Sequence, residues 1–256
     1  MSTDHTGSFL DIQTDRGIAF VTFAHPAGNS FPSAQLQATE YAFRQLATDQ
    51  SVKAIVLQSN GSGPFCAGAS FDELLAVTNE AEGLAFFSGF ARVINAMRRC
   101  PQWIIGRVQG KTVGGGVGLA AACDVVFATE KAAVKLSEIA IGIGPFVIEP
   151  AVSRKIGSTA MSALAFVPDQ WKSAAWALEK GLYNEVFETE QLMDEALQLY
   201  LEQLRNYHRD AMKSLKEITW QGTEHWDQLL LERAAISGQL VLSDFTKNAL
   251  NQFKKK

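Results

Sequence analysis

The chain has 256 residues, a length that allows one large domain or one domain with a smaller helical region attached. Its formal net charge of −4 argues against a broad nucleic-acid-binding surface, because such surfaces need a clustered excess of Lys and Arg. The apolar stretch over residues 113–128 contains Asp124 and four glycines, so it is not a membrane span. The polar N-terminal sequence MSTDHTGSF is unlike a secretory signal, and we expect a cytoplasmic protein.

Cysteine and histidine give no sign of a metal centre. The three Cys residues, at positions 66, 100 and 123, form no CxxC pair, which predicts reduced thiols rather than a disulfide framework. The four His residues are scattered, without HExxH or another paired spacing. We therefore expect no metal ion and no redox cofactor.

The first half of the chain alternates strand-like and helix-like segments. Residues 18–23, IAFVTF, predict a strand, and Ser33 is the expected N-cap of a helix over 34–48. Residues 54–57, AIVL, predict a strand that is apolar on both faces. Such alternation implies helices covering an interior sheet. The remaining expected elements are a loop at 60–64, helices at 71–77 and 80–98, a strand at 103–108, a helix at 114–123 and a strand at 124–129.

From about residue 150 the pattern becomes helical. Apolar residues recur with a spacing near 3.6, and strand signals are few. We therefore expect an α/β core over residues 1–190 and a helical region over residues 191–256. An expected buried stripe in this region consists of Leu192, Ala196, Leu199 and Leu204. The expected helices are 158–166, 171–180, 189–206, 207–217, 223–238 and 242–254.

Two loops of small residues and one acid carry the chemistry. Residues 65–71, FCAGASF, and residues 110–118, GKTVGGGVG, each lead into an expected helix, and Glu138 is expected at the end of the apolar strand VKLSE. Taken singly, a glycine run also fits tight packing and an acid also fits a helix cap. Together, two free N–H groups at helix starts can hold one anionic oxygen as an oxyanion hole, while a carboxylate moves a proton.

The segments FCAGASFDEL, VGGGVGLAAACDVVFA and KLSEIAIGIG resemble, in order and spacing, motifs of the enoyl-CoA hydratase/isomerase (crotonase) family. The turn HPAGNSF and the later EKGLYNEVF are also similar to that family, so the resemblance covers nearly the whole chain. It implies an α/β fold with a ββα spiral core and a helical C-terminal trimerisation region. It also implies an acyl-CoA substrate, no cofactor besides the CoA of that substrate, and a homotrimer or a dimer of trimers.

The resemblance assigns roles position by position. It implies that Ala69 and Gly115 supply the two oxyanion-hole N–H groups and that Glu138 is the second of the two glutamates of family hydratases. The first glutamate is replaced by Gly118 here. The implied substrate- and CoA-binding residues are Ala67, Gly68, Ser70, Phe71, Asp72, Gly114, Phe253 and Lys256. We expect further pocket walls from the helices within 72–98 and from the loop at 143–150.

The missing first glutamate favours double-bond isomerisation, which needs one carboxylate, over enoyl-CoA hydration, which is the alternative. Family hydrolases resemble this chain as far as Glu138 but carry an aspartate at the position of Phe146, so thioester hydrolysis is a minor alternative. Glu149 is either a displaced second acid or a helix-start charge. A non-catalytic CoA-binding member of the family is the remaining alternative.

Two nucleotide-binding motifs are matched only in part. Residues 116–121 fit the GxGxxA fingerprint of a dinucleotide site, with Glu138 placed 20 residues after Gly118. The loop at 110–114 separates this segment from the preceding strand, whereas a Rossmann fingerprint opens the helix directly after the strand. The Gly110-Lys111-Thr112 sequence lacks the upstream glycine of a P-loop, because that position is Ile105.

Overall fold

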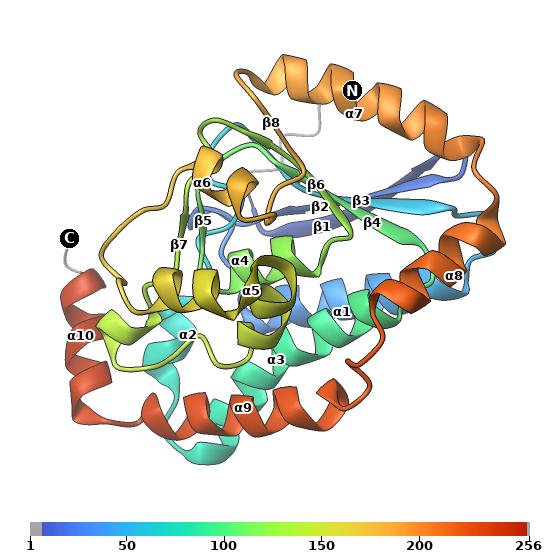
Figure 1. Ribbon diagram of the computed structural model, residues 1–256. Coiled ribbons are helices and arrows are strands. Elements are labelled where there is room, and N and C mark those ends of the chain that lie inside the picture. Colours follow the sequence, from blue (N-terminus) through green and yellow to red (C-terminus); the bar gives the residue numbers. More distant parts are fainter. Residues whose placement is uncertain (1–6, 255–256) are drawn as a thin grey trace.

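A six-stranded sheet organises the chain in the computed structural model, which describes residues 7–254 without the side chains of residues 253 and 254. The strand order is β1-β2-β3-β4-β6-β8 (Figure 1). β1 pairs antiparallel with β2, and all other neighbours are parallel. The strands are β1 Phe9–Asp15, β2 Ile18–Ala24, β3 Ala54–Ser59, β4 Trp103–Val108, β6 Val125–Thr129 and β8 Glu185–Phe187; β5 Thr112–Val113 and β7 Val134–Lys135 form a small second sheet.

Helices cover both faces of the large sheet. α7 lies over one face, and α1, α3 and α4 lie over the other (Figure 1). A short 3-10 helix, η1 (Glu138–Ile141), follows β7. The helices are α1 Ser33–Thr48, α2 Phe71–Ala76, α3 Glu80–Arg99, α4 Gly115–Ala122, α5 Glu149–Ala165, α6 Ala174–Glu179, α7 Glu190–Arg205, α8 Arg209–Thr219, α9 Trp226–Leu240 and α10 Asp244–Lys254.

The strand β3 shows why an interior strand reads as continuously apolar. Its alternate side chains point to opposite faces. Ala54 and Val56 pack in the cluster that contains the buried leucines of α7, whereas Ile55 and Leu57 pack in the cluster of α1 and α3. All four are fully buried, which confirms the predicted strand. Both clusters hold the sheet rigid, and its loops can therefore position a site.

Two strands of the six-stranded sheet were not predicted from the sequence. β1, FLDIQTD, is an edge strand whose second half is exposed, so it lacks the apolar pattern of an interior strand. β8 has three residues, EVF, and is too short to give a periodic signal. The edge pairing of each strand, rather than its own pattern, places it in the sheet.

The structure also corrects two helix expectations. Ser33 is not the N-cap, because Pro32 occupies that position, without a side-chain capping hydrogen bond, and the Ser33 hydroxyl donates to Glu73 Oε2 at 2.6 Å. The buried stripe of α7 does not contain Leu192 or Leu199, which are exposed. The stripe consists of Met193, Leu197, Leu201 and the expected Leu204, and the expected Ala196 packs, partly buried, against the same cluster. Leucines occur on both the buried and the exposed sides of α7, so leucine spacing alone does not identify its buried face.

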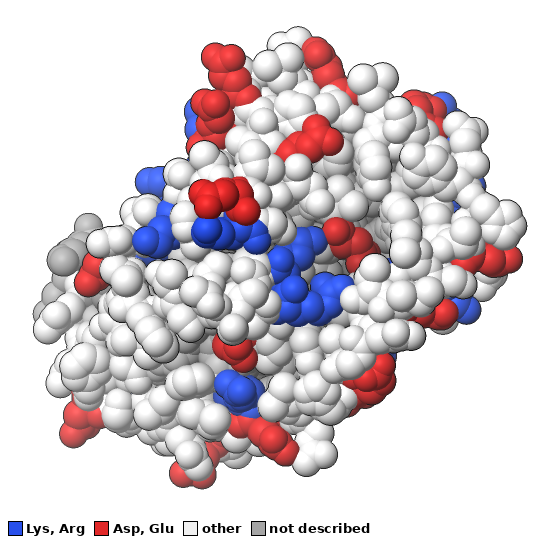
Figure 2. All heavy atoms as spheres, in the orientation of Figure 1, with Lys and Arg blue, Asp and Glu red and all other residues white. Residues whose placement is uncertain are grey.

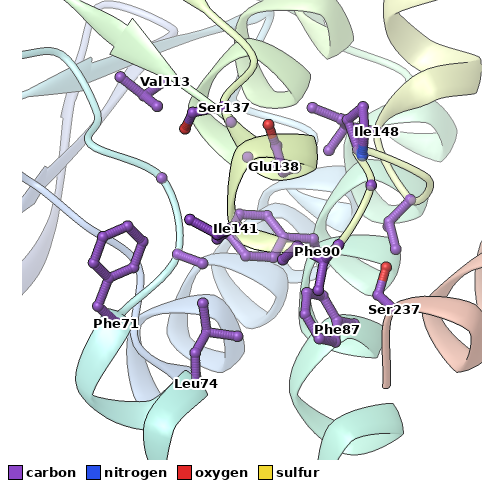
Figure 3. A pocket seen from close by; sticks show the side chains of 18 of the residues that line it. Phe71, Leu74, Phe87, Phe90, Val113, Ser137, Glu138, Ile141, Ile148 and Ser237 are labelled. Atoms are coloured by element: carbon purple, nitrogen blue, oxygen red, sulfur yellow. The ribbon is translucent and has the colours of Figure 1, made fainter. Parts of the chain in front are cut away.

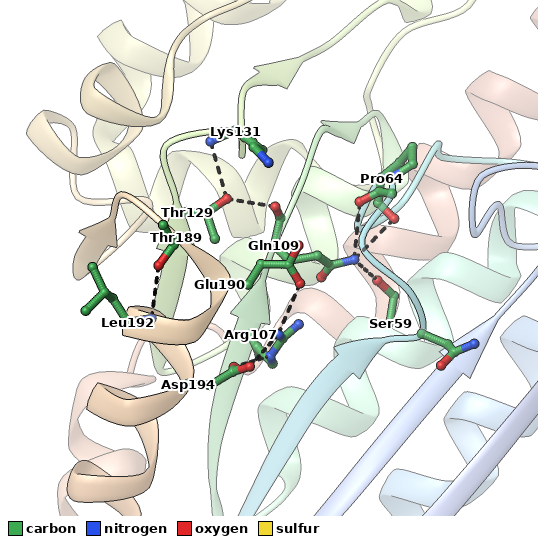
Figure 4. A network of polar contacts seen from close by, with 12 residues as sticks. Ser59, Pro64, Arg107, Gln109, Thr129, Lys131, Thr189, Glu190, Leu192 and Asp194 are labelled. Atoms are coloured by element: carbon green, nitrogen blue, oxygen red, sulfur yellow. Dashed lines mark hydrogen bonds and ion pairs between the residues drawn. The ribbon is translucent and has the colours of Figure 1, made fainter. Parts of the chain in front are cut away.

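Polar contacts fix the carboxyl ends of β3 and β4 (Figure 4). Gln109 Nε2 donates to Ser59 Oγ at 2.8 Å, which links the segments that leave the two strands. The Gln109 carbonyl accepts from Thr129 Oγ1 at 2.7 Å. Arg107 donates to Asp194 at 2.8 Å and so ties β4 to α7. The loops that follow β3 and β4 therefore start from fixed points.

A buried ion pair joins α8 to the opposite end of the sheet. Lys216 Nζ lies 2.8 Å from Asp124 Oδ2, and the Lys216 side chain is only 3% exposed. Asp124 also accepts from the Ile104 N–H and from Trp220 Nε1, both at 2.8 Å. Every oxygen of this carboxylate is therefore paired.

Charge is unevenly spread over the surface. Figure 2 shows Lys and Arg side chains gathered in the middle of one face, with Asp and Glu mostly towards its edges. A hollow beside β4 and α8 is lined by Arg154, Lys155 and Lys216. Lys155 donates to the carbonyls of Cys123 and Asp124, each at 2.9 Å, so this side chain stabilises the contact between α5 and the segment before β6.

We expect Asp124→Ala to lower the free energy of unfolding by about 3–5 kcal/mol, because it leaves the buried Lys216 ammonium without its counter-ion. Glu179→Ala, which removes the partner of the exposed Lys180, should cost less than about 1 kcal/mol. Urea denaturation of both variants measures the difference. Equal losses would show that the Asp124 pair does not carry this part of the fold.

Candidate active site

The two loops of small residues meet at the carboxyl end of the sheet. One loop follows β3 and the other follows β4, and these strands are parallel neighbours, so both loops leave the same edge. The Val113 N–H donates to the Cys66 carbonyl at 2.9 Å, and the Phe65 N–H donates to the Lys111 carbonyl at 3.0 Å. The loops therefore run side by side as an extension of the sheet.

Glycine allows this close approach. Gly68 has φ +91°, and a Cβ built on it would lie 3.1 Å from the Val113 carbonyl oxygen and 3.8 Å from the Gly115 nitrogen. A Cβ on Gly116 would lie 2.6 Å from Cys66 Cβ. Side chains at these positions would force the loops apart.

The contact leaves two backbone N–H groups without partners. Ala69 forms a parallel bridge with Phe31, in which Gly68 and Ser70 provide the hydrogen-bonding groups, so the Ala69 N–H points to the other side. Gly115 is the first residue of α4, where an N–H has no partner within the helix. Within residues 7–254 neither N–H donates a hydrogen bond. Both residues line the same pocket.

Glu138 lies in the lining of this pocket as well, but not at a strand end as expected. β7 ends at Lys135, and Glu138 is the first residue of η1. A Cβ built on Gly114 would lie 2.9 Å from Glu138 Oε1, so the carboxyl contacts the backbone just before α4. The residue as a whole is half-buried, whereas Oε2 is buried and has no hydrogen-bond partner in the described chain.

The pocket is small and almost entirely apolar (Figure 3). It has a cavity volume of about 70 Å³. Glu138 is the one ionisable side chain among the described residues that line it. Its lining consists of Ala67, Gly68, Ala69, Phe71, Leu74, Phe87, Phe90, Val113, Gly114, Gly115, Ser137, Glu138, Ile141, Ile143, Gly144, Pro145, Val147, Ile148 and Ser237.

Burial raises the pKa of Glu138 from its ordinary 4.5 to about 7, because the apolar surroundings disfavour the charged carboxylate. The backbone N–H groups of Glu138 and Ser137 lower the pKa by less. Of the apolar residues close to Glu138 in sequence, Ile141 lines the pocket, whereas Ile139 is 49% exposed. A carboxyl with this pKa is able to accept and return a proton near neutral pH.

Four of the predicted substrate-binding residues, Ala67, Gly68, Phe71 and Gly114, line the pocket. Ser70 and Asp72 do not. Ser70 instead caps α2, where its hydroxyl accepts from the Glu73 N–H at 3.4 Å. For Phe253 only the backbone is described, in α10, and Lys256 lies outside the described residues.

The space beside Gly118 is filled. A Cβ built on Gly118 would lie 2.4 Å from Ile148 Cγ2, and Ile148 itself lines the pocket. Glu149 is absent from that lining and starts α5, where it accepts from Ser153 Oγ at 2.6 Å. This position is that of a helix-start charge.

The helices and the loop expected to form walls both contribute to the lining, the helices through Leu74, Phe87 and Phe90 and the loop through residues 143–145 and 147–148. Ser237 was not expected. It lies on α9, about 100 residues from Glu138 in sequence, and no motif marks it.

Solved structures share this fold. An enoyl-CoA hydratase from Bacillus halodurans matches with a TM-score of 0.88 at 20% identity, covering 96% of this chain and 100% of that chain. Pseudomonas aeruginosa AtuE matches with a TM-score of 0.77 at 28% identity, over 82% of this chain and 81% of that chain. The architecture is thus a crotonase fold with a helical C-terminal region, as predicted.

Sequence comparison then gives the family. The profile described as enoyl-CoA hydratase/isomerase matches residues 13–253. The short-chain-enoyl-CoA hydratase of Clostridium acetobutylicum is 30% identical over 190 residues, which are 73% of this chain and 72% of that protein. The human mitochondrial methylglutaconyl-CoA hydratase is 31% identical over 52% of this chain and 39% of that protein. The chain therefore belongs to the enoyl-CoA hydratase/isomerase family, and an acyl-CoA substrate fits this family.

Residues 7–254 show no sign of a metal site, a disulfide or a membrane-spanning helix. No group of three or more His, Cys, Asp and Glu side chains among them is arranged to hold a metal ion. The three cysteines are buried and unpaired. None of the helices described is long and apolar enough to cross a membrane.

We expect Glu138→Gln to raise the free energy of unfolding at pH 8 by up to about 3 kcal/mol, because the folded protein must otherwise hold a buried carboxylate. The folded pKa is raised, so wild-type stability is highest below pH 4.5 and falls as the pH rises to about 7. The difference between variant and wild type should therefore shrink towards pH 4.5. Urea denaturation at pH 5 and pH 8 measures it; a difference independent of pH would contradict burial of the carboxyl.

Proposed function

We propose that the protein moves the double bond of an enoyl-CoA thioester between the β,γ and α,β positions. Glu138 removes a proton from the α carbon, and the electron pair passes to the thioester oxygen. The Ala69 and Gly115 N–H groups hold the resulting enolate oxygen. Glu138 then returns the proton to the γ carbon as the double bond moves into conjugation, so no atom is gained or lost.

One observation carries the choice of reaction: Glu138 is the sole ionisable side chain among the described residues of an apolar pocket. Moving a proton along one face of a substrate needs one group that accepts and then donates it. Adding water also requires a group that activates the water. By the family resemblance that group belongs at Gly118, where Ile148 fills the space.

The pKa of Glu138 supports the same choice. A value of about 7 keeps both protonation states populated near neutral pH, and a shuttle needs both in each turnover. The contact of the carboxyl with Gly114 places it beside the start of α4, so it lies next to one of the two proposed enolate donors.

Hydration is the second candidate, and the relatives favour it. The 30% identical protein of Clostridium acetobutylicum is named a short-chain-enoyl-CoA hydratase. The same enolate clamp serves both reactions, so the two candidates differ only in whether water reaches the β carbon.

We further propose a homotrimer or a dimer of trimers, as the resemblance implies. Exposed apolar side chains on α8 and α9 support such an assembly, since isolated copies would leave them in water. They are Leu215, Ile218, Leu231, Ile236 and Leu240.

The direct test is incubation with a short trans-3-enoyl-CoA, with the position of the product double bond read by NMR. We expect a 2-enoyl-CoA product, and in D₂O some deuterium at the γ carbon. Glu138→Gln should lower kcat at least about 100-fold with little change in CoA-ester affinity, because the proton shuttle is lost while the shape is kept. A 3-hydroxyacyl-CoA as the main product would favour hydration, and undiminished turnover by Glu138→Gln would remove the proposed role.

A second acid should be accepted only when space is made for it. Gly118→Glu alone overpacks against Ile148 and should cost about 1–3 kcal/mol of stability. Gly118→Glu combined with Ile148→Ala should fold better and form 3-hydroxyacyl-CoA from a 2-enoyl-CoA. Ile148→Ala alone is the control and should not. Equal hydration by the control and the double variant would mean that the second carboxylate is irrelevant.

A further inference from the structure

One hydroxyl in the pocket has no partner. Ser237 of α9 is 1% exposed, it lines the pocket, and its Oγ has no hydrogen-bond partner in the described chain. A serine inside a helix commonly donates to the carbonyl four residues earlier, but Ser237 does not. Figure 3 shows its oxygen directed towards the other side chains that line the pocket.

The crossing of α3 and α9 fixes Ser237 there. A Cβ built on Gly83 of α3 would lie 2.6 Å from the Gly238 carbonyl oxygen, and a Cβ on Gly238 would lie 2.7 Å from the Leu84 nitrogen. The two backbones are thus in direct contact at the residue after Ser237. Phe87, one turn after Gly83, also lines the pocket. Ser237 is therefore held by a rigid crossing and not by a mobile loop.

A buried hydroxyl without a partner opposes folding, since it has lost its bonds to water. Alanine at this position would fit the same helix and the same apolar wall without that cost. The hydroxyl therefore contributes nothing to the fold that its present contacts explain. Its position in the pocket points to a partner on the ligand.

We propose that Ser237 selects acyl-CoA substrates whose acyl group carries a neutral oxygen function, a hydroxyl or a ketone, away from the thioester. The inference rests on the proposed acyl-CoA function of the pocket. A serine hydroxyl both donates and accepts, so it serves either group. A carboxylate is disfavoured, because the described lining contains no Lys, Arg or His, and Glu138 in its charged form repels it.

The size of the cavity limits the acyl group. A cavity of about 70 Å³ favours a short acyl group, and five-carbon esters are therefore suitable probes.

Binding of saturated esters tests the proposal independently of turnover. We would measure the affinities of pentanoyl-CoA, 5-hydroxypentanoyl-CoA and glutaryl-CoA by calorimetry for the wild type and for Ser237→Ala. In the wild type the hydroxy ester should bind about tenfold more tightly than pentanoyl-CoA, the effect of one added hydrogen bond, and glutaryl-CoA should bind most weakly. Ser237→Ala should abolish the tenfold preference and leave pentanoyl-CoA affinity unchanged.

Stability and a matched control separate recognition from structure. Ser237→Ala should keep or raise Tm, because it removes an unpaired buried hydroxyl. Ser88→Ala, at a buried serine of α3 outside the pocket lining, should keep the preference for the hydroxy ester. No preference in the wild type, a preference retained in Ser237→Ala, or tightest binding of glutaryl-CoA would overturn the proposal. A preference lost in Ser237→Ala without isomerase turnover would uphold this inference and reject only the proposed reaction.

Discussion

The contact between two backbone segments, without side chains between them, is the constraint on which the site depends. Gly68 approaches the Val113 carbonyl and the start of α4 so closely that a Cβ would meet them at 3.1 Å and 3.8 Å. This contact places the N–H of Ala69 and that of Gly115 in the lining of one pocket. The donors belong to the backbone of a rigid sheet edge, so they need no reorganisation when charge develops on a ligand oxygen.

Two polar atoms of the site lower the stability of the folded protein. Among residues 7–254, Glu138 Oε2 and Ser237 Oγ are both buried side-chain oxygens without a hydrogen-bond partner, and both residues line the same pocket. Natural folds rarely leave such atoms unpaired. The cost is offset by the two apolar clusters that enclose the sheet and by fully paired charges elsewhere, such as Asp124 with Lys216. Two of the four buried side-chain atoms without a hydrogen-bond partner among the described residues, the others being Gln109 Oε1 and Arg205 Nη1, thus lie where a ligand can satisfy them.

The sequence predicted the parts of the fold that local pattern determines. Interior strands such as β3 are apolar on both faces, and the glycine loops are recognisable because few other residues permit their backbone contacts. β1 and β8 were not predicted, because edge strands depend on pairing with a neighbour rather than on their own apolar pattern. Glu138 is predicted at a strand end but starts η1, since nothing in KLSE distinguishes a strand end from a 3-10 turn. Ser237 was not predicted as a pocket residue, because its proximity to the pocket arises from the packing of α9 on α3.

The exchange at Gly118 links the chemistry to the packing. Losing a side chain from a pocket wall would ordinarily leave a cavity, and cavities destabilise the surrounding core. Here Ile148 Cγ2 occupies the direction in which a side chain on Gly118 would project, and the wall is continuous and apolar. An isoleucine in that space binds no water, whereas a vacated polar space would. In the proposed isomerisation, this continuous apolar wall keeps the pKa of Glu138 raised, so that the carboxyl can take a proton from the substrate and return it.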